Sequence, residues 1–329
     1  MQEPLFRVSF DAARLLCDYP PKLHHANKTA LFELAYPPDS EVHGTIEVTR
    51  WRADIDDQLS LPQRAESTVE PNFYNYPASP AGILEWHVNF ADPNLFVAYG
   101  SGLFAQDEMQ VAEHPLLGSV REALLATGLP TLTRDEDGGS PILVRGVERR
   151  IEVQTNPDGA AGRPFGLYGN RFAAARVDTI RRATRKIEPA TISNIIAVAA
   201  PAYGRGKYRP GQIEYVLETA FTAFAAAHHE TLRALGPDAQ TTIHTGFWGC
   251  GAFGGNRCLM IALQSLAARA TCIDRVVYHA GDAAGVLEVR RGLDVADMLA
   301  AKCGPECDLG TLIDQCVPLG YEWGISDGN

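Results

Sequence analysis

The sequence predicts an α/β fold, because stretches typical of strands and of helices alternate along its second half. Residues 84–90 alternate between apolar and polar side chains, as in a strand with two different faces. Residues 193–200 form a continuous apolar run ended by Pro201, which is typical of a strand buried on both faces. Residues 213–224 then repeat apolar side chains at helical spacing. This succession favours a layered sheet-and-helix protein.

Length and composition narrow the class of protein. The chain has 329 residues, of which 46% are hydrophobic and 21% charged, as in globular domains. A formal net charge of −11 argues against general nucleic-acid binding, which needs a basic surface. No apolar run approaches the length that spans a bilayer, and the first residues form no basic leader, so we expect a cytoplasmic protein without membrane association.

The seven cysteines are an odd number scattered along the chain, which favours reduced thiols over a disulfide framework. Cys303, Cys307 and Cys316 have no fourth ligand at the spacing of a zinc site, so no metal is expected.

Further elements follow from local patterns. The Pro- and Asn-rich residues 71–80 have the chemistry of a turn or connection, which places a boundary near Pro80. Other ranges predict a helix near residues 10–16, a strand at 45–51, a hairpin or strand at 143–153, a helix from about Pro115, a hairpin about Gly285 and a helix at 293–299.

The most informative stretch is residues 243–257, where five glycines stand among large aromatic side chains. Residues 241–245 resemble the end of a strand, and apolar side chains recur at helical spacing from Leu259 onward. The glycines therefore lie where a strand turns into a helix. Backbone N–H groups can converge there beside the positive end of the helix dipole, which suits a phosphate or diphosphate.

Two other interpretations of this stretch remain open. Gly249, Gly251 and Gly254 have the Gly-x-Gly-x-x-Gly spacing of dinucleotide-binding proteins, and Asp282 ends the next strand-like stretch. That fold normally places the motif at the start of its domain, with several more strand–helix units after it. A tight turn that binds no ligand would also use glycines, since they permit close packing.

A second stretch carries adjacent acidic side chains. Gln106, Asp107 and Glu108 follow the predicted strand at 84–90 and precede the predicted helix at Pro115. Taken alone, such a triplet is typical of a solvated loop. If it lies in a site, however, one carboxyl group can protonate a departing sugar oxygen and then activate water, while the other holds the ribose hydroxyls.

Both stretches resemble the poly(ADP-ribose) glycohydrolase family, which has a macrodomain fold. The run Thr-Gly-Phe-Trp-Gly-Cys-Gly-Ala-Phe-Gly-Gly-Asn at 245–256 is similar to the family's diphosphate loop, with Phe247 and Asn256 where the family usually has Asn and Asp. The run Val-Asn-Phe-Ala-Asp at 88–92 and the later Gln-Asp-Glu are similar to the family's Val-Asp-Phe-Ala-Asn and Gln-Glu-Glu. The family's triple glycine is absent, and Leu-Phe-Val-Ala-Tyr at 95–99 occupies its approximate place.

The resemblance implies roles for particular residues. Glu108 corresponds to the catalytic glutamate, and Asp107, one methylene shorter than the family's glutamate, corresponds to the residue that orients the ribose. Tyr168 is the closest match to a tyrosine that stacks on adenine. The remaining substrate-binding residues implied in this way are Gln106, Asn89, Phe90, Asp92, Gly249, Cys250, Gly251, Ala252, Phe253, Gly254 and Gly255.

The resemblance also implies an architecture and an activity. It implies a three-layer α/β/α macrodomain-like core with a mixed sheet at residues 81–285, between an N-terminal extension at 1–80 that packs on the core and a C-terminal extension at 286–329. The activity would be hydrolysis of the glycosidic bond of an ADP-ribosyl group, without cofactor or metal. Two alternatives stay open: a module that binds ADP-ribose without cleaving it, and a hydrolase of another ADP-ribose-derived conjugate.

Overall fold

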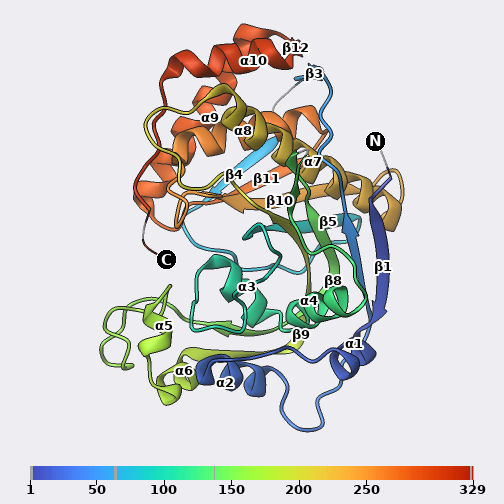
Figure 1. Cartoon of the computed structure of the whole chain (residues 1–329), viewed down its shortest axis with the longest axis vertical. Helices are drawn as coiled ribbons and strands as arrows, with labels where there is room; N and C mark the ends of the chain where they lie inside the picture. The colour runs from blue at the N-terminus through green and yellow to red at the C-terminus, as the bar shows by residue number, and fades with distance from the viewer. Residues whose placement is uncertain (1–2, 63–64, 137, 327, 329) are drawn as a thin grey trace.

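The computed structural model describes residues 3–62, 65–136, 138–326 and 328. Its centre is an eight-stranded mixed sheet in the order β1-β2-β8-β9-β5-β10-β11-β4 (Figure 1). The strands from β9 to β4 run parallel to one another, whereas β1, β2 and β8 are joined by antiparallel pairing. The bounds of the strands are β1 (Phe6–Asp11), β2 (Thr45–Arg50), β4 (Glu66–Glu70), β5 (Ile83–Phe90), β8 (Ile142–Val153), β9 (Thr184–Val198), β10 (Gln240–Gly246) and β11 (Arg275–His279).

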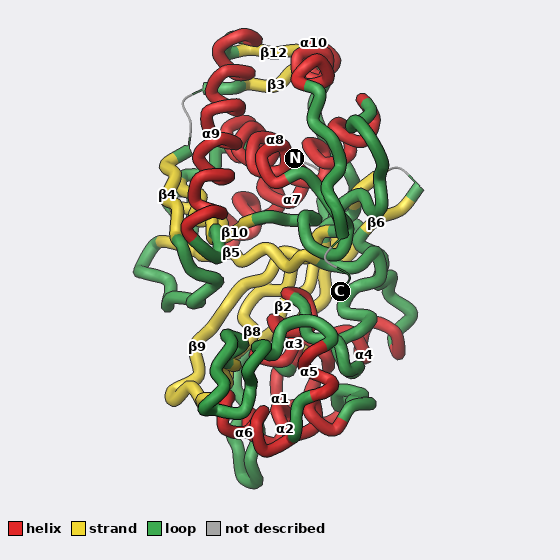
Figure 2. The backbone as a smooth tube through the Cα atoms, turned by 90° about the vertical axis from the view of Figure 1, so that its left-hand side faces the viewer, coloured by secondary structure: helices red, strands yellow, loops and turns green. Residues whose placement is uncertain are grey.

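Helices cover both faces of the sheet (Figure 2). One layer consists of α7 (Pro210–Leu235), α8 (Arg257–Ala270), α9 (Ala283–Cys303) and α10 (Leu309–Cys316), followed by the short 3-10 helix η1 (Val317–Leu319). The other consists of α1 (Ala12–Asp18), α2 (Ala26–Ala35), α3 (Gln106–Glu113), α4 (Leu116–Ala126), α5 (Arg171–Ala174) and α6 (Val177–Ala183). Two short ladders pair β3 (Gln58–Ser60) with β12 (Glu306–Asp308) and β6 (Arg134–Asp135) with β7 (Gly138–Gly139). The predicted three-layer α/β/α class with a mixed sheet is confirmed.

The central strands form where the sequence patterns predict them. In β5, Trp86 and Val88 enter the hydrophobic core beneath α7 and α8. In β9, Ile196 joins that same core, whereas its neighbour Ile195 joins the core beneath α4. The alternating strand and the strand buried on both faces are therefore both confirmed. None of the described helices combines the length and apolar character that crossing a membrane requires.

The polar face of β5 is buried as well. His87 and Asn89 are almost fully buried, and the ring of His87 stacks on that of His244 in β10 at a centroid distance of 4.3 Å. Tyr74 and Tyr76, from the connection before β5, pack against His87. Burial holds the pKa of His87 well below its ordinary value, so this histidine is neutral at neutral pH. The Pro- and Asn-rich segment thus covers part of the sheet.

Two local predictions were wrong. Gln106, Asp107 and Glu108 do not lie in a loop but form the first turn of α3. The sequence conceals this helix because it is short and polar; its stability comes from packing on β5 and β8. The hairpin expected about Gly285 is instead the first turn of α9. The glycines of α9 allow close helix packing: a Cβ on Gly292 would lie 2.8 Å from the carbonyl oxygen of Cys258 in α8.

The N-terminal segment takes part in the central sheet. Strands β1, β2 and β4 all lie before residue 80, and β4 pairs with β11 at the far edge. Helix α9 spans the predicted boundary at residue 285. The division into 1–80, 81–285 and 286–329 stays a prediction.

Candidate functional site

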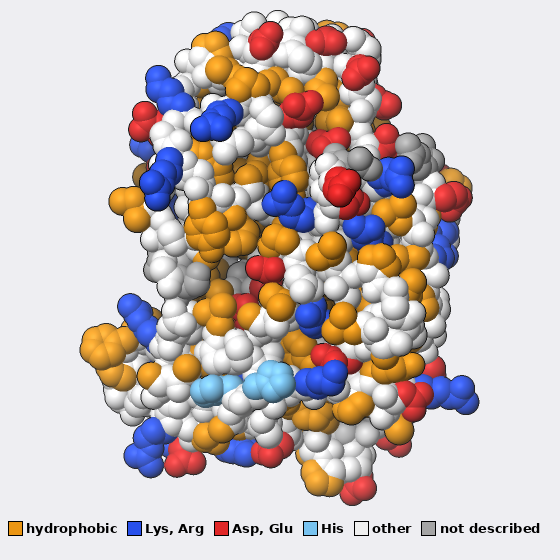
Figure 3. Space-filling view, viewed as in Figure 1, with side chains coloured by type: hydrophobic (Ala, Val, Ile, Leu, Met, Phe, Trp, Pro, Cys, Tyr) orange, Lys and Arg blue, Asp and Glu red, His pale blue; other side chains and the backbone are white. Residues whose placement is uncertain are grey.

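The acidic triplet at residues 106–108 and the glycine-rich stretch follow the neighbouring parallel strands β5 and β10. Since β5 lies between β9 and β10, the loops after all three begin at the same edge of the sheet. The glycine-rich loop, residues 247–256, lies against these strand ends. A Cβ on Gly246 would lie 3.7 Å from Cζ of Phe90, and the Nε1–H of Trp248 donates to the carbonyl of Val198 at 3.1 Å. The surface in this region is hollowed between the two helical layers, and acidic side chains are visible there (Figure 3).

Hydrogen bonds fix the first turn of α3 on the end of β5. Gln106 accepts from the N–H of Phe90 at 2.8 Å and donates to the carbonyl of Val88 at 3.2 Å. Asn89 donates through its side-chain amide to Asp107 Oδ1 at 3.0 Å. These residues, which the sequence predicts as substrate-binding, therefore hold Asp107 and the neighbouring Glu108 in place.

Glu108 sits at the third position of α3 and is almost fully buried. Its Oε2 accepts from the backbone N–H of Ala105 at 3.0 Å, a contact that also caps the helix. Its Oε1 makes no hydrogen bond among the described residues, so this oxygen is available to a ligand.

The environment favours the protonated form of both carboxyl groups. Burial, followed by the negative charge of Glu108, raises the pKa of Asp107 to about 8. Burial also raises the pKa of Glu108, opposed by the ammonium of Lys28 and by backbone hydrogen bonds and reinforced by Asp92. Asp92 itself is half-buried, and its Oδ1 accepts from the N–H of Asn94 at 2.9 Å. A carboxyl group that keeps its proton near neutral pH can act as a general acid.

The glycine-rich loop presents unpaired backbone donors. Internal hydrogen bonds from Cys250 to Phe247, from Gly254 to Gly251 and from Gly255 to Gly249 fold the loop back on itself. Within the described part of the chain, no acceptor pairs with the N–H groups of Gly249, Gly251, Ala252 and Phe253. Asn256 then caps α8 by accepting from the N–H of Leu259 at 3.1 Å. Free amides before a helix N-terminus are the arrangement that binds an anion.

The backbone of this loop requires glycine at Gly249. Its φ is +73°, and a Cβ there would lie 2.4 Å from Cβ of Ala200, two residues after β9. Gly254 also has a positive φ, and the C-terminal segment at Gly324 passes close to it. Phe253 accepts from the N–H of Tyr203 at 3.3 Å, and the two rings form an edge contact at 5.7 Å.

The segment that carries Tyr168 is tied to the start of α3. The N–H of Gly169 donates to the carbonyl of Phe104 at 2.9 Å, and Phe104 stacks on Phe172. Tyr168 is 38% exposed. In α2, Asn27 donates to the carbonyl of Phe172 at 2.7 Å. The predicted adenine-stacking tyrosine is thus on a loop joined to the acidic helix.

The sequence did not predict the C-terminal segment as part of this region. Trp323 stacks on Tyr208 at 4.4 Å, and the hydroxyl of Tyr208 accepts from the N–H of Asn256 at 2.9 Å. Gly324 donates to the carbonyl of Gly254 at 2.8 Å. In Figure 1 this segment descends from α10 toward the gap between the helical layers. The only sequence signal was Trp323 next to Gly324, which is too weak to predict a contact with the glycine-rich loop.

Residues 95–99, in place of the family's triple glycine, do not fill the site with bulky side chains. Leu95 and Phe96 are fully buried, and Tyr99 nearly so, in the hydrophobic core beneath α4. Val97 is the member of this run whose side chain is largely exposed. Phe96 has a φ of +53°, an uncommon conformation for a residue with a side chain, which turns the chain sharply here.

The fold and site define an α/β/α protein with paired carboxyl groups and a glycine-rich loop of unpaired backbone amides at the carboxyl ends of parallel strands. Residues 153–285 match the sequence model of the family described as poly(ADP-ribose) glycohydrolase (PARG), macro domain fold. This match confirms the family resemblance over less than half of the chain. It includes the glycine-rich loop and Tyr168 but not Asp107 and Glu108.

Solved structures of this family are similar to the chain. Poly(ADP-ribose) glycohydrolase from Thermomonospora curvata is 16% identical, with 86% of this chain and 93% of that chain covered and a TM-score of 0.47. The same enzyme bound to the inhibitor ADP-HPD gives 16% identity, coverage of 86% and 92%, and a TM-score of 0.45. Poly(ADP-ribose) glycohydrolase from Deinococcus radiodurans in complex with ADP-ribose is 14% identical, with 88% of this chain and 94% of that chain covered and a TM-score of 0.41. A search of curated proteins found no match.

Proposed function

We propose that this protein hydrolyses the glycosidic bond of an ADP-ribosyl group, with Glu108 as the general acid and base. The observation that carries the proposal is the convergence of the acidic turn of α3 and the free amides of the glycine-rich loop at one sheet edge. The family match over residues 153–285 supports the same substrate class. ADP-ribose is the ligand in one of the similar solved structures.

The ligand would extend from the acidic helix to the glycine-rich loop. Its diphosphate accepts hydrogen bonds from the free N–H groups of Gly249, Gly251, Ala252 and Phe253, next to the N-terminus of α8. The ring of Phe253 packs near the distal ribose. Tyr168 stacks on the adenine from its exposed side.

The chemistry uses Glu108 twice. The protonated carboxyl gives its proton to the departing oxygen as the bond to the anomeric carbon breaks through an oxocarbenium-like transition state. The resulting carboxylate then takes a proton from water as the water oxygen attacks that carbon. Asp107, held by Asn89, forms hydrogen bonds with the ribose hydroxyls and keeps the sugar in register.

Replacement of Glu108 by Gln tests the catalytic role. The amide has the shape of the carboxyl group but cannot supply the proton, so we expect turnover to fall about 10²–10⁴-fold while ADP-ribose binding stays within about threefold. Release of ADP-ribose from polymer and from modified proteins is followed by chromatography, and binding by calorimetry. The matched control is Glu33→Gln, an exposed carboxylate of α2 that pairs with Arg181. Full turnover in the Glu108 variant would refute the assignment.

A second candidate function is binding of ADP-ribose without cleavage. The observation that favours it is the hydrogen bond from Ala105 to Glu108, because a helix cap needs this carboxylate whether or not catalysis occurs. A wild-type protein that binds ADP-ribose but releases none from any conjugate would establish this function. Testing a panel of ADP-ribose conjugates also separates cleavage of polymer or modified protein from cleavage of another conjugate.

Composition adds two narrower proposals. The net charge of −11 supports the proposal that the protein does not bind nucleic acids in general. The second proposal is a cytoplasmic location, as the sequence analysis predicts. Salt-dependent retention on a DNA column and fractionation of cells test these two points.

A further inference from the structure

Lys28 is a charged side chain inside the protein, close to the acidic helix. It lies in the first turn of α2 and is only 2% exposed. Its Nζ donates to the backbone carbonyl of Tyr99 at 2.7 Å. The rings of Phe104 and Phe172 lie 5.2 Å and 5.8 Å from the ammonium. A buried ammonium with one carbonyl acceptor and two aromatic neighbours needs further compensation of its charge.

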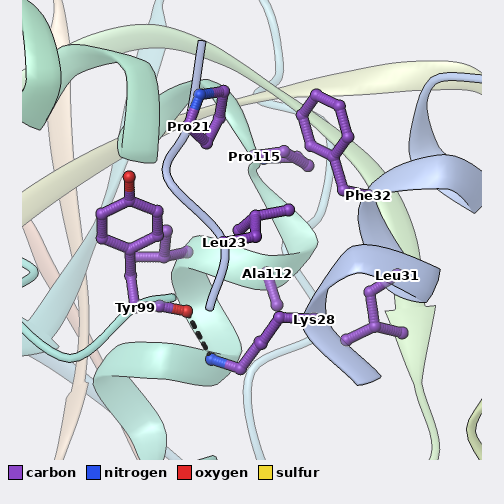
Figure 4. Close-up of a pocket in the computed structure, with 9 residues that line it drawn as sticks. Pro21, Leu23, Lys28, Leu31, Phe32, Tyr99, Ala112 and Pro115 are labelled. Carbon is purple, nitrogen blue, oxygen red and sulfur yellow. Dashed lines mark hydrogen bonds between the residues drawn. The ribbon is translucent and has the colours of Figure 1, made fainter. Parts of the chain in front are cut away.

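The contacts of Lys28 hold the segment that leads into α3. Figure 4 shows its nitrogen directed at the Tyr99 carbonyl, away from the apolar side chains of Leu31 and Phe32. Tyr99 and Phe104 stand at the two ends of the short segment that precedes α3, and Lys28 touches both. The lysine therefore fixes the backbone from which Asp107 and Glu108 project.

The charges of Lys28 and of the acidic pair act on each other. Burial lowers the pKa of Lys28 to about 8, and the negative charges of Glu108 and then Asp107 oppose this effect. In return, the ammonium lowers the pKa of both carboxyl groups, against burial and against Asp92. At neutral pH the lysine is therefore mostly charged, and its charge favours the ionised form of both carboxyl groups.

The other elements packed on α2 leave this interaction undisturbed. Arg181 of α6 pairs with Glu33, and Arg150 of β8 lies over the ring of Tyr36. Both contacts are nearer the carboxyl end of α2 than Lys28 is.

We propose that Lys28 is a positioning residue for the reaction, whose buried ammonium holds the segment that leads into α3 and supplies a positive charge to the buried pair Asp107 and Glu108. This inference rests on the proposed hydrolase function.

Replacement of Lys28 by Met removes the charge and keeps the length of the side chain. Without the ammonium the pKa of both carboxyl groups rises, so we expect both limbs of the pH–rate profile to move to higher pH by about 1–2 units. Affinity for ADP-ribose, measured by calorimetry at pH 7, should change less than about threefold. Lys28→Gln keeps a donor for the Tyr99 carbonyl without the charge and should show the same displacement.

Lys22→Met is the matched control. Lys22 precedes α2, and its exposed ammonium pairs with Glu122 at 2.5 Å rather than with Asp107 or Glu108. This variant should keep the wild-type pH profile. Loss of activity in both Lys28 variants with unmoved limbs would overturn the proposal, as would failure of both variants to fold at pH 7, because Lys28 would then serve the fold alone.

Failure of the proposed hydrolase function can be distinguished from failure of the Lys28 proposal. If the wild type cleaves no ADP-ribosyl conjugate, the hydrolase proposal fails. Carbon-13 NMR titration of the carboxyl groups in wild type and in Lys28→Met then still tests the lysine. Upward displacement of the titrations of Asp107 and Glu108 in the variant supports the charge effect, and identical titrations refute it.

Discussion

Asp107→Asn should stabilise the protein while impairing its activity. Among the described residues, Asp107 accepts a hydrogen bond from Asn89 and forms no ion pair. The asparagine side chain has nearly the same shape, and its oxygen can accept the same hydrogen bond. The substitution therefore removes a buried ionisable group without leaving a cavity or an unpaired partner.

The size of the effect follows from the pKa of Asp107. Burial raises this pKa to about 8 from an ordinary value of 3.8. In the folded protein the group stays protonated up to about pH 8, whereas in the unfolded chain it ionises near pH 4. Unfolding therefore releases a proton between these values, and wild-type stability falls with rising pH by at most about 1.4 kcal/mol per unit. Relaxation and water penetration reduce the effect, so we expect a gain of about 1–4 kcal/mol at pH 8.

The assay is urea-induced unfolding of wild type and variant at several pH values from 5 to 8. The difference in the free energy of unfolding should grow with pH, because the wild-type protein loses stability and the variant lacks that loss. Hydrolysis of ADP-ribosyl conjugates should fall about 10–100-fold, since the amide places a group that can only donate where Asp107 has its second carboxyl oxygen for the ribose hydroxyls.

Glu113→Gln provides the contrast on the same helix. Glu113 is also buried, but its carboxylate accepts from Nε of Arg149 at 2.8 Å and from the N–H of Val153 at 2.9 Å. Neutralising it leaves a buried guanidinium unpaired, so we expect a loss of about 3 kcal/mol. A variant of Asp107 that is less stable than wild type at pH 8, or whose gain is independent of pH, would refute the reasoning.

Three further outcomes test other parts of the structure. Gly249→Ala places a side chain where φ is positive and a Cβ would lie 2.4 Å from Cβ of Ala200, so the substitution distorts the loop. Calorimetry should then show ADP-ribose binding at least about tenfold weaker. Unchanged affinity would mean that the loop does not hold the diphosphate. Trp323→Ala removes the stack on Tyr208 and should lower the free energy of unfolding by about 2 kcal/mol; a change below about 0.5 kcal/mol in urea would contradict this. Burial would raise the pKa of Glu230, but the guanidinium groups of Arg7 and Arg233 lower it to about 2. Glu230→Gln should therefore lower the free energy of unfolding, measured in urea at pH 7, by about 3 kcal/mol. Equal stability of variant and wild type would show that these ion pairs contribute nothing.

The sequence by itself determined the central strands and the turn from strand to helix at the glycine-rich loop. Residues 84–90 and 193–200 carry patterns typical of strands, because alternation and continuous apolarity match one-sided and two-sided burial. The glycines of residues 243–257 likewise predicted a strand-to-helix turn, since glycine adopts a positive φ such as that of Gly249 more readily than residues with a Cβ.

Tertiary structure alone decided how those pieces act together. Asp107 and Glu108 look like solvated charges in the sequence, and only the packing of α3 on β5 buries them and raises their pKa. Lys28 has no sequence signal at all, because its contact with Tyr99 joins residues 71 positions apart. The physical reason is the same in both cases: local patterns record which face of an element is buried, whereas the charge balance of a site depends on groups that meet only after the chain has folded.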